Sequence, residues 1–244
     1  MESVVSVAKW KEKEMDYKII NDSLKWPQIN AAMLYIYDNE IINNTSQPAI
    51  LEFGTGAGNS TKKICDYLKA NNWEHTWVFT FDSFDGLPYE DQNVKLFPKY
   101  TRGAYKLDKT DPIKYIKEKC EYPRLYVVHS DFETLYTQKL PQLWEQDFTE
   151  VINPVLIHID CDLYSSTRAV LSWLYQHKLI RKGLLLAYDE YQSTNSIFDG
   201  GESLAHYQFT ASKNIITDEI WRNTYYDKDN GQRIRQSVWE VVKV

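Results

Sequence analysis

The chain has 244 residues, a formal net charge of −6, and acidic and basic residues mixed along its length. This length suits one α/β domain with a sizeable core, and the charge pattern argues against a surface for nucleic acid or anionic membranes. Its three cysteines lack the spacing of a metal site, which favours a reducing compartment. Because no apolar run approaches the ~20 residues of a membrane helix, we expect a soluble, cytoplasmic protein.

Apolar and aromatic residues recur at helical spacing through residues 1–46. They predict two or three helices that form an N-terminal helical cap on a core made by residues 47–244, within a single domain. The simpler interpretation is a cap over one edge of the sheet, because amphipathic stripes usually pack against a core. A lid over a ligand or a dimer surface is the alternative.

The strand pattern of residues 49–53 runs directly into a glycine-rich turn, GTGAG, and then into a helical pattern over about residues 60–70. Glycine permits positive φ and lets a ligand lie on the backbone. The free N–H groups at the start of a helix favour a carboxylate or a phosphate. The pattern predicts a nucleotide-type ligand at this turn, and a plain tight turn is the alternative.

A second strand pattern covers residues 76–81 and ends at Asp82. In doubly wound sheets an acidic residue at this place reaches the ribose hydroxyls of the ligand, although an aspartate can also simply close a turn. The following stretch, 83–112, is rich in Gly, Pro and charge and is too long for an ordinary connection, so it could cover a substrate. A short helix is predicted over residues 112–120.

Three further parallel strands are predicted over residues 124–129, 155–159 and 184–187, and acidic residues follow each of them. Asp131, after the first of these strands, could either accept a hydrogen bond from an adenine amino group or cap the next turn. His158 lies inside the second strand, where a hydrogen-bonded core histidine is a better interpretation than a ligand or a base.

The C-terminal part is predicted to contain a helix over residues 202–211 and two strands over residues 219–226 and 237–242. Asn230 and Gly231 lie between these strands and indicate a hairpin. A hairpin that completes a parallel sheet gives a mixed, mostly parallel, seven-stranded sheet. The polar residues after its five parallel strands then share one edge, where open α/β sheets bind ligands.

Three carboxylates, those of Asp160, Asp189 and Glu190, follow two strands that we expect to be neighbours, about 4.8 Å apart. Clustered carboxylates either raise a pKa or bind a cation, and an all-oxygen set favours Mg²⁺. Such an ion would lower the pKa of an acceptor hydroxyl. Asp160 is the preferred general base and His206 a weaker candidate. The alternative is that the acids only cap loops and helices.

Several segments, in this order and spacing, resemble the macrocin O-methyltransferase (TylF/MycF-like) family of class I S-adenosylmethionine-dependent methyltransferases. They are LEFGTGAGNST, FDSFDGLP, HSDFETL, HIDCDLYSST, AYDEY and GGESLAHYQF. The resemblance implies a Rossmann-like α/β fold and the metal-assisted transfer of a methyl group to a hydroxyl. The acceptor implied is a small molecule or a saccharide, commonly a sugar of a natural product or polysaccharide, and a homodimer is possible.

The same resemblance implies metal ligands at Asp160, Asp189 and Glu190. Cys161 stands where the family usually has Gly, and Glu190 stands where it usually has Asp. The second difference touches the expected metal shell, because Glu is longer by one methylene. We expect the cofactor to contact the glycine turn and the ends of the second and third strands. The residues expected there are Glu52, Gly54, Thr55, Gly56, Ser60, Asp82, Ser83, Phe84, Ser130, Asp131 and Phe132.

Two other functions are compatible with parts of this pattern. A nicotinamide-dependent oxidoreductase shares the glycine turn and the ribose acid, but its fingerprint has a third Gly where this chain has Asn59. A catalytically degenerate, methyltransferase-fold binding protein would not need the intact turn together with the three acids. We therefore favour an S-adenosylmethionine-dependent, Mg²⁺-assisted O-methyltransferase.

Overall fold

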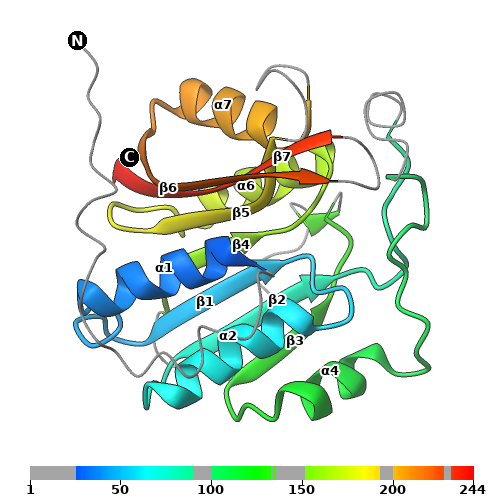
Figure 1. Ribbon diagram of the computed structural model, residues 1–244, viewed down its shortest axis with the longest axis horizontal. Coiled ribbons are helices and arrows are strands. Elements are labelled where there is room, and N and C mark those ends of the chain that lie inside the picture. The colour runs from blue at the N-terminus through cyan, green and yellow to red at the C-terminus, as the bar shows by residue number, and fades with distance from the viewer. Residues whose placement is uncertain (1–25, 91–99, 133, 136–151, 193–199, 228–231) are drawn as a thin grey trace.

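The computed structural model describes residues 26–90, 100–132, 134–135, 152–192, 200–227 and 232–244. At its centre lies a seven-stranded sheet with helices on both faces (Figure 1). Five strands run parallel: β1 (Pro48–Phe53), β2 (Trp77–Asp82), β3 (Leu125–His129), β4 (Asn153–Ile159) and β5 (Leu185–Gln192). The last two, β6 (Ile216–Asp227) and β7 (Gln232–Lys243), form an antiparallel hairpin.

The strand order is β3-β2-β1-β4-β5-β7-β6, so the first strand of the sequence lies near the middle of the sheet. It pairs in parallel with β2 on one side and with β4 on the other. The strands that follow β1 are thus added on one side of it as far as β3 and on its other side from β4 onwards. Ligands bind at such a reversal of strand order, beyond the carboxyl ends of the strands. The predicted mixed, seven-stranded α/β sheet with a C-terminal hairpin is confirmed.

Helices cover both faces of the sheet, which explains why the central strands are apolar without alternation. One face carries α1 (Pro27–Asp38), α2 (Asn59–Ala70) and α4 (Pro112–Cys120), and the other carries α6 (Tyr164–Gln176) and α7 (Gly201–Lys213). All six residues of β1 are buried. The core on the α1 side of the sheet includes Met33 and Leu185, and the core on the α6 side includes Trp173, whose ring packs edge-on against Phe53.

Local sequence sets where several helices begin. The side chain of Asp111 accepts a hydrogen bond from the backbone N–H of Lys114 at 2.9 Å and caps α4, whose first residue is a proline. Proline suits the first position of a helix because its ring fixes φ near the helical value. The N–H that it lacks would have no partner within the helix at that position. Pro27 begins α1 in the same way. These signals placed α4 at its predicted bounds.

The structure differs from the sequence-based prediction in three places. Strand β5 continues beyond the predicted residue 187 to Gln192, which pairs with Arg235 of β7 after an irregularity that follows Tyr188. The strands of the hairpin are likewise longer than predicted. Helix α1, expected as a cap over one edge, packs on a face of the sheet against β4, β5 and β7 and also against the edge strand β6. The helices expected within residues 1–25 and the hairpin turn at 229–231 lie outside the described residues.

Among the residues described, no helix combines the length and the apolar character needed to cross a bilayer.

Candidate functional site

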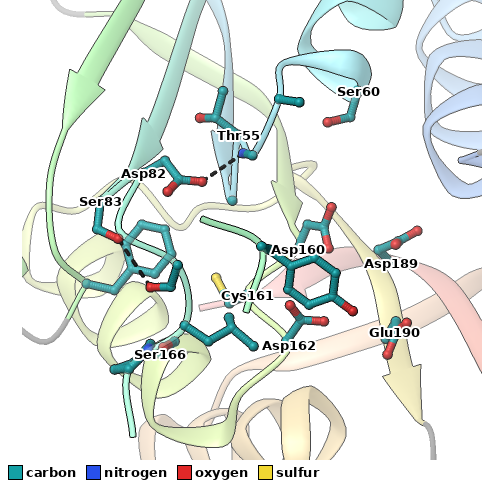
Figure 2. Close-up of a pocket in the computed structure, with 18 of the residues that line it drawn as sticks. Thr55, Ser60, Asp82, Ser83, Asp160, Cys161, Asp162, Ser166, Asp189 and Glu190 are labelled. Carbon is teal, nitrogen blue, oxygen red and sulfur yellow. Dashed lines mark hydrogen bonds between the residues drawn. The ribbon is translucent and has the colours of Figure 1, made fainter. Parts of the chain in front are cut away.

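A pocket of about 340 Å³ opens beyond the carboxyl ends of the strands, at the reversal of strand order next to β1. Figure 2 shows the glycine turn and Asp82 on one side of it and four carboxylates, from Asp160, Asp162, Asp189 and Glu190, on the other. Nine of the eleven residues expected to contact the cofactor line it: Gly54, Thr55, Gly56, Ser60, Asp82, Ser83, Ser130, Asp131 and Phe132.

The glycine turn has the backbone conformation that its sequence predicts. Gly54 has φ +99°, and a Cβ added to it would lie 1.9 Å from the backbone oxygen of Asp160. Gly56 has φ +49°, and a Cβ there would meet no atom within 4 Å, because it would point into open space. Only glycine can occupy position 54 without moving β4, whereas position 56 leaves its backbone open to a ligand.

Asp82 at the end of β2 holds this turn through backbone hydrogen bonds. Its carboxylate accepts the N–H of Gly56 at 2.8 Å and the N–H of Phe84 at 2.6 Å. Burial raises the pKa of Asp82, and these hydrogen bonds oppose that rise. The alternative of a turn aspartate is thus what the structure shows. The expected ribose contact stays a prediction, since each carboxylate oxygen has a second lone pair.

Two residues expected at the cofactor lie away from the pocket lining. The side chain of Phe84 is buried against His129. The carboxylate of Glu52 is fully buried and accepts hydrogen bonds from Thr61 and from Thr80, the latter at 2.8 Å. Glu52 lies inside β1, two residues before Gly54, and its side chain is directed at Thr61 of α2 and Thr80 of β2, so it holds buried polar groups together instead of facing the pocket.

The three carboxylates predicted to hold a metal ion all line the pocket. Burial is the main reason that the pKa of Asp160 is raised well above its usual range, and the charges of Asp189, Asp162 and Glu202 add to it. Glu202, at the start of α7, accepts the backbone N–H of Cys161 at 3.0 Å and is itself buried. This side of the pocket therefore concentrates negative charge, which a cation or a proton would relieve.

The described residues nevertheless contain no group of three His, Cys, Asp or Glu side chains that could hold a metal ion. Asp189 and Glu190 occupy successive positions within β5, at the irregularity in its pairing with β7 between Tyr188 and Gln192. Figure 2 shows the carboxylates of Asp160, Asp189 and Glu190 at separate points along one side of the pocket. The prediction assumed that both acids follow the strand end, whereas the structure places them inside the longer β5.

His206, the weaker candidate for the base, is not brought to the pocket. Its Nδ1 lies 2.8 Å from the hydroxyl of Tyr188 and its Nε2 lies 3.2 Å from the hydroxyl of Thr217. Burial lowers the pKa of this imidazole to about 3. His158, in contrast, is a fully buried core histidine with both ring nitrogens hydrogen-bonded, as the sequence suggested.

Sequence reasoning missed several residues of the pocket wall. Trp26 comes from the N-terminal helical stretch and Leu87 and Tyr105 come from the long connection after β2, and only the fold brings the three together. Leu87 and Tyr105 belong to the long stretch that was expected to cover a substrate, and the described part of that stretch does line the pocket. Asp162 carried a usable signal, since it follows Asp160 by two residues in the same acidic motif.

Comparison with known proteins establishes the family to which this chain belongs. The family profile described as macrocin-O-methyltransferase (TylF) matches residues 6–221. The chain belongs to this family. The resemblance inferred from the six sequence segments is therefore confirmed. No curated protein sequence matches the chain.

Solved structures with the same fold include several methyltransferases. CalS11, a calicheamicin methyltransferase, has a TM-score of 0.63 and 17% identity over 94% of this chain and 87% of its own. NovP, an O-methyltransferase, has a TM-score of 0.62 and 16% identity over 88% and 80%. TomG from Streptomyces achromogenes, an O-methyltransferase solved with SAM, has a TM-score of 0.52 and 12% identity over 90% and 82%. At such identities the likeness shows the fold.

The two glycines give a matched test of the turn. Gly54→Ala should prevent stable folding or displace Asp160, because its Cβ would overlap the backbone oxygen of that residue. Gly56→Ala, with the same added methyl but open space around it, should cost only about 1 kcal/mol for its positive φ. Urea unfolding of both variants measures the difference, and equal stabilities would contradict the close contact at position 54.

A pH titration tests the buried state of His206. The folded protein holds this imidazole neutral, with a pKa of about 3, while the unfolded chain takes up a proton near pH 6.5. Its contribution to stability is complete above pH 6.5 and is lost as the pH falls from there towards 3. Between pH 7.5 and 5.5 the wild type should lose about 1.4 kcal/mol more stability than His206→Gln. Parallel pH profiles would show that His206 is accessible to protons in the fold.

Proposed function

We propose that this protein is an S-adenosylmethionine-dependent O-methyltransferase that acts on a hydroxyl of a small molecule or saccharide, with a divalent cation, Mg²⁺, assisting. The observation that supports it best is one pocket, in a chain of the macrocin O-methyltransferase family, with a glycine turn at one end and clustered carboxylates at the other. The first end suits a nucleoside-type methyl donor, and the second suits an acceptor whose hydroxyl must lose a proton.

The cofactor end fits S-adenosylmethionine, which supplies the methyl group when bound. Gly56 leaves open space above its backbone, as close contact with a ligand requires. Asp82 is already fixed by two backbone hydrogen bonds and keeps lone pairs for ribose hydroxyls. Asp131 lines the same pocket and is proposed to accept the adenine amino group.

The donor chemistry of the other end fits a hard cation, since its ligands would be carboxylate oxygens. We propose that Asp160 and Asp189 hold Mg²⁺, with Glu190 as a further ligand. Two carboxylates suffice, because Mg²⁺ commonly keeps several waters. When bound, the ion would polarise the acceptor hydroxyl. Asp160 is also the proposed acceptor of the hydroxyl proton, because it lines the pocket and its pKa is raised well above its usual range, first by burial and then by the charges of Asp189, Asp162 and Glu202.

A sugar is the proposed acceptor class. One solved structure of CalS11, with a TM-score of 0.54 and 16% identity, is described as a TDP-rhamnose 3'-O-methyltransferase. In this chain the pocket wall combines Trp26 and Tyr105 with the polar groups of Asp162 and Ser166. Aromatic faces beside hydrogen-bonding groups match a sugar, which has both apolar C–H faces and hydroxyls.

A direct test is methyl transfer from S-adenosylmethionine to free deoxysugars, nucleotide-activated sugars and glycosylated natural products, with release of S-adenosylhomocysteine as the readout. Thermal stabilisation should be obtained with S-adenosylhomocysteine and not with NAD⁺ or NADP⁺. Stabilisation by a nicotinamide cofactor alone would favour the oxidoreductase. Cofactor binding without transfer to any acceptor would favour a degenerate binding protein.

The cofactor site is tested by Asp82→Asn. The variant loses the charge-assisted hydrogen bonds to ribose, worth roughly 1.5–3 kcal/mol each, so affinity for S-adenosylhomocysteine should fall by about 10-fold or more. Asp85→Asn is the matched control, since Asp85 is exposed on the same loop and its carboxylate forms an ion pair with Lys106 at 3.6 Å. Calorimetric titration measures both variants, and an unchanged affinity in Asp82→Asn would restrict Asp82 to its turn.

The cation is tested by stripping the enzyme with EDTA. Methyl transfer should stop and return with Mg²⁺, while S-adenosylhomocysteine still binds, because the glycine turn lies at the other end of the pocket. Asp189→Asn should raise the Mg²⁺ concentration for half-maximal rate, since it removes a charge at nearly constant volume. Glu190→Asp restores the usual residue of the family and should keep activity. Full activity of the stripped wild type would remove the cation from the reaction.

A further inference from the structure

Helix α1 has one polar residue on its buried face. Gln28 is fully buried, among apolar residues of the same helix that pack on the sheet, including Ile29 and Met33. Burial removes the water molecules that would otherwise hydrogen-bond the amide. Its donors must therefore find partners inside the protein. The contacts of Gln28 therefore indicate what this helix does besides covering the sheet.

The amide nitrogen of Gln28 bridges two groups of the sheet. It lies 2.6 Å from Oδ1 of Asp189 and 3.2 Å from Nε2 of His158. Since a carboxylate only accepts hydrogen bonds, the amide nitrogen and not its oxygen must face Asp189. The second N–H of the Gln28 amide is directed at Nε2 of His158, so Nε2 accepts this hydrogen bond. The proton of this imidazole sits on Nδ1 and is donated to Oε1 of Glu52 at 3.2 Å.

These bonds continue as far as the glycine turn. The carboxylate of Glu52 also accepts the hydroxyl of Thr80, which is itself hydrogen-bonded to Thr55 in the pocket wall. A continuous chain of buried polar groups thus runs from Asp189, on the carboxylate side of the pocket, to Thr55, on the cofactor side. Gln28 is the link through which the N-terminal helix enters this chain.

We propose that Gln28 is a positioning residue for the carboxylate of Asp189, an inference that rests on the proposed function. Gln236 of β7 donates to the same oxygen of Asp189 at 2.8 Å. The amides of Gln28 and Gln236 therefore both hold Oδ1. We infer that Oδ2 is the oxygen that acts in the pocket that Asp189 lines. Orienting groups behind a ligand or catalytic carboxylate govern its affinity and activity in this way.

Gln28→Met removes both donors while keeping an unbranched side chain of similar length. Mn²⁺ binding, measured by electron paramagnetic resonance, should weaken by about 10-fold or more, and kcat should fall by a similar factor. Affinity for S-adenosylhomocysteine should stay within about twofold. Met33→Ala is the control, since Met33 is a buried apolar residue of the same helix, and its loss loosens the packing of α1 without removing a donor to Asp189, so Mn²⁺ affinity should stay unchanged.

A double variant shows whether Gln28 acts through Asp189. In the Asp189→Asn background, Gln28→Met should cause no further loss of rate or of Mn²⁺ affinity. Wild-type Mn²⁺ affinity in Gln28→Met, or an equal loss in both backgrounds, would overturn the inference. If the wild type transfers no methyl group or binds no cation, the proposed function fails instead. A crystal structure of Gln28→Met then decides: a reoriented Asp189 supports the inference, and an unmoved one overturns it.

Discussion

The contact between Gly54 and the backbone of Asp160 is the constraint on which the site depends. The residue after β1 lies so close to the residue after β4 that any side chain at position 54 would overlap the Asp160 backbone oxygen. The N–H of Asp160 donates to the carbonyl of Phe53 at 2.9 Å and closes the same junction. The glycine turn and the first acidic residue are thereby held together at the reversal of strand order.

This junction places two different settings for a carboxylate in one pocket. On the cofactor side, backbone N–H groups already compensate the negative charge of Asp82. On the other side, burial first and then the charges of Asp189, Asp162 and Glu202 raise the pKa of Asp160 well above its usual range. Such a cluster of carboxylates is stabilised when a cation or a proton arrives, whereas the carboxylate of Asp82 is already held by its backbone donors.

The N-terminal helix has a larger part in this arrangement than a cap would have. Apolar residues of α1 bury one face of the sheet, while Trp26, just before it, lines the pocket. Gln28 reaches through the same interface to Asp189 and His158. The helix that encloses the core is thus also in contact with the groups proposed to act on the acceptor, so a change in its packing would be felt at the site.

The sequence by itself determined the fold and the location of the site. Apolar strands alternating with helical patterns gave the sheet, and the acidic residues after each strand gave its binding edge, because local periodicity and turn chemistry are written along the chain. The glycine turn and Asp82 were recognised for the same reason. The residues expected at the cofactor that lie at or after a strand end line the pocket, with the exception of Phe84, and their contact with the cofactor stays a prediction.

Only the tertiary structure decided which way individual side chains face. Glu52 was expected at the cofactor but is turned towards the sheet interior, where Thr61 and His158 surround it. Asp189 and Glu190 were expected beyond β5, but the strand continues to Gln192, so both acids lie within it, at an irregularity in its pairing with β7. Gln28 gave no signal at all, because its partners are more than a hundred residues away along the chain. Such contacts depend on register and long-range packing, which no local pattern encodes.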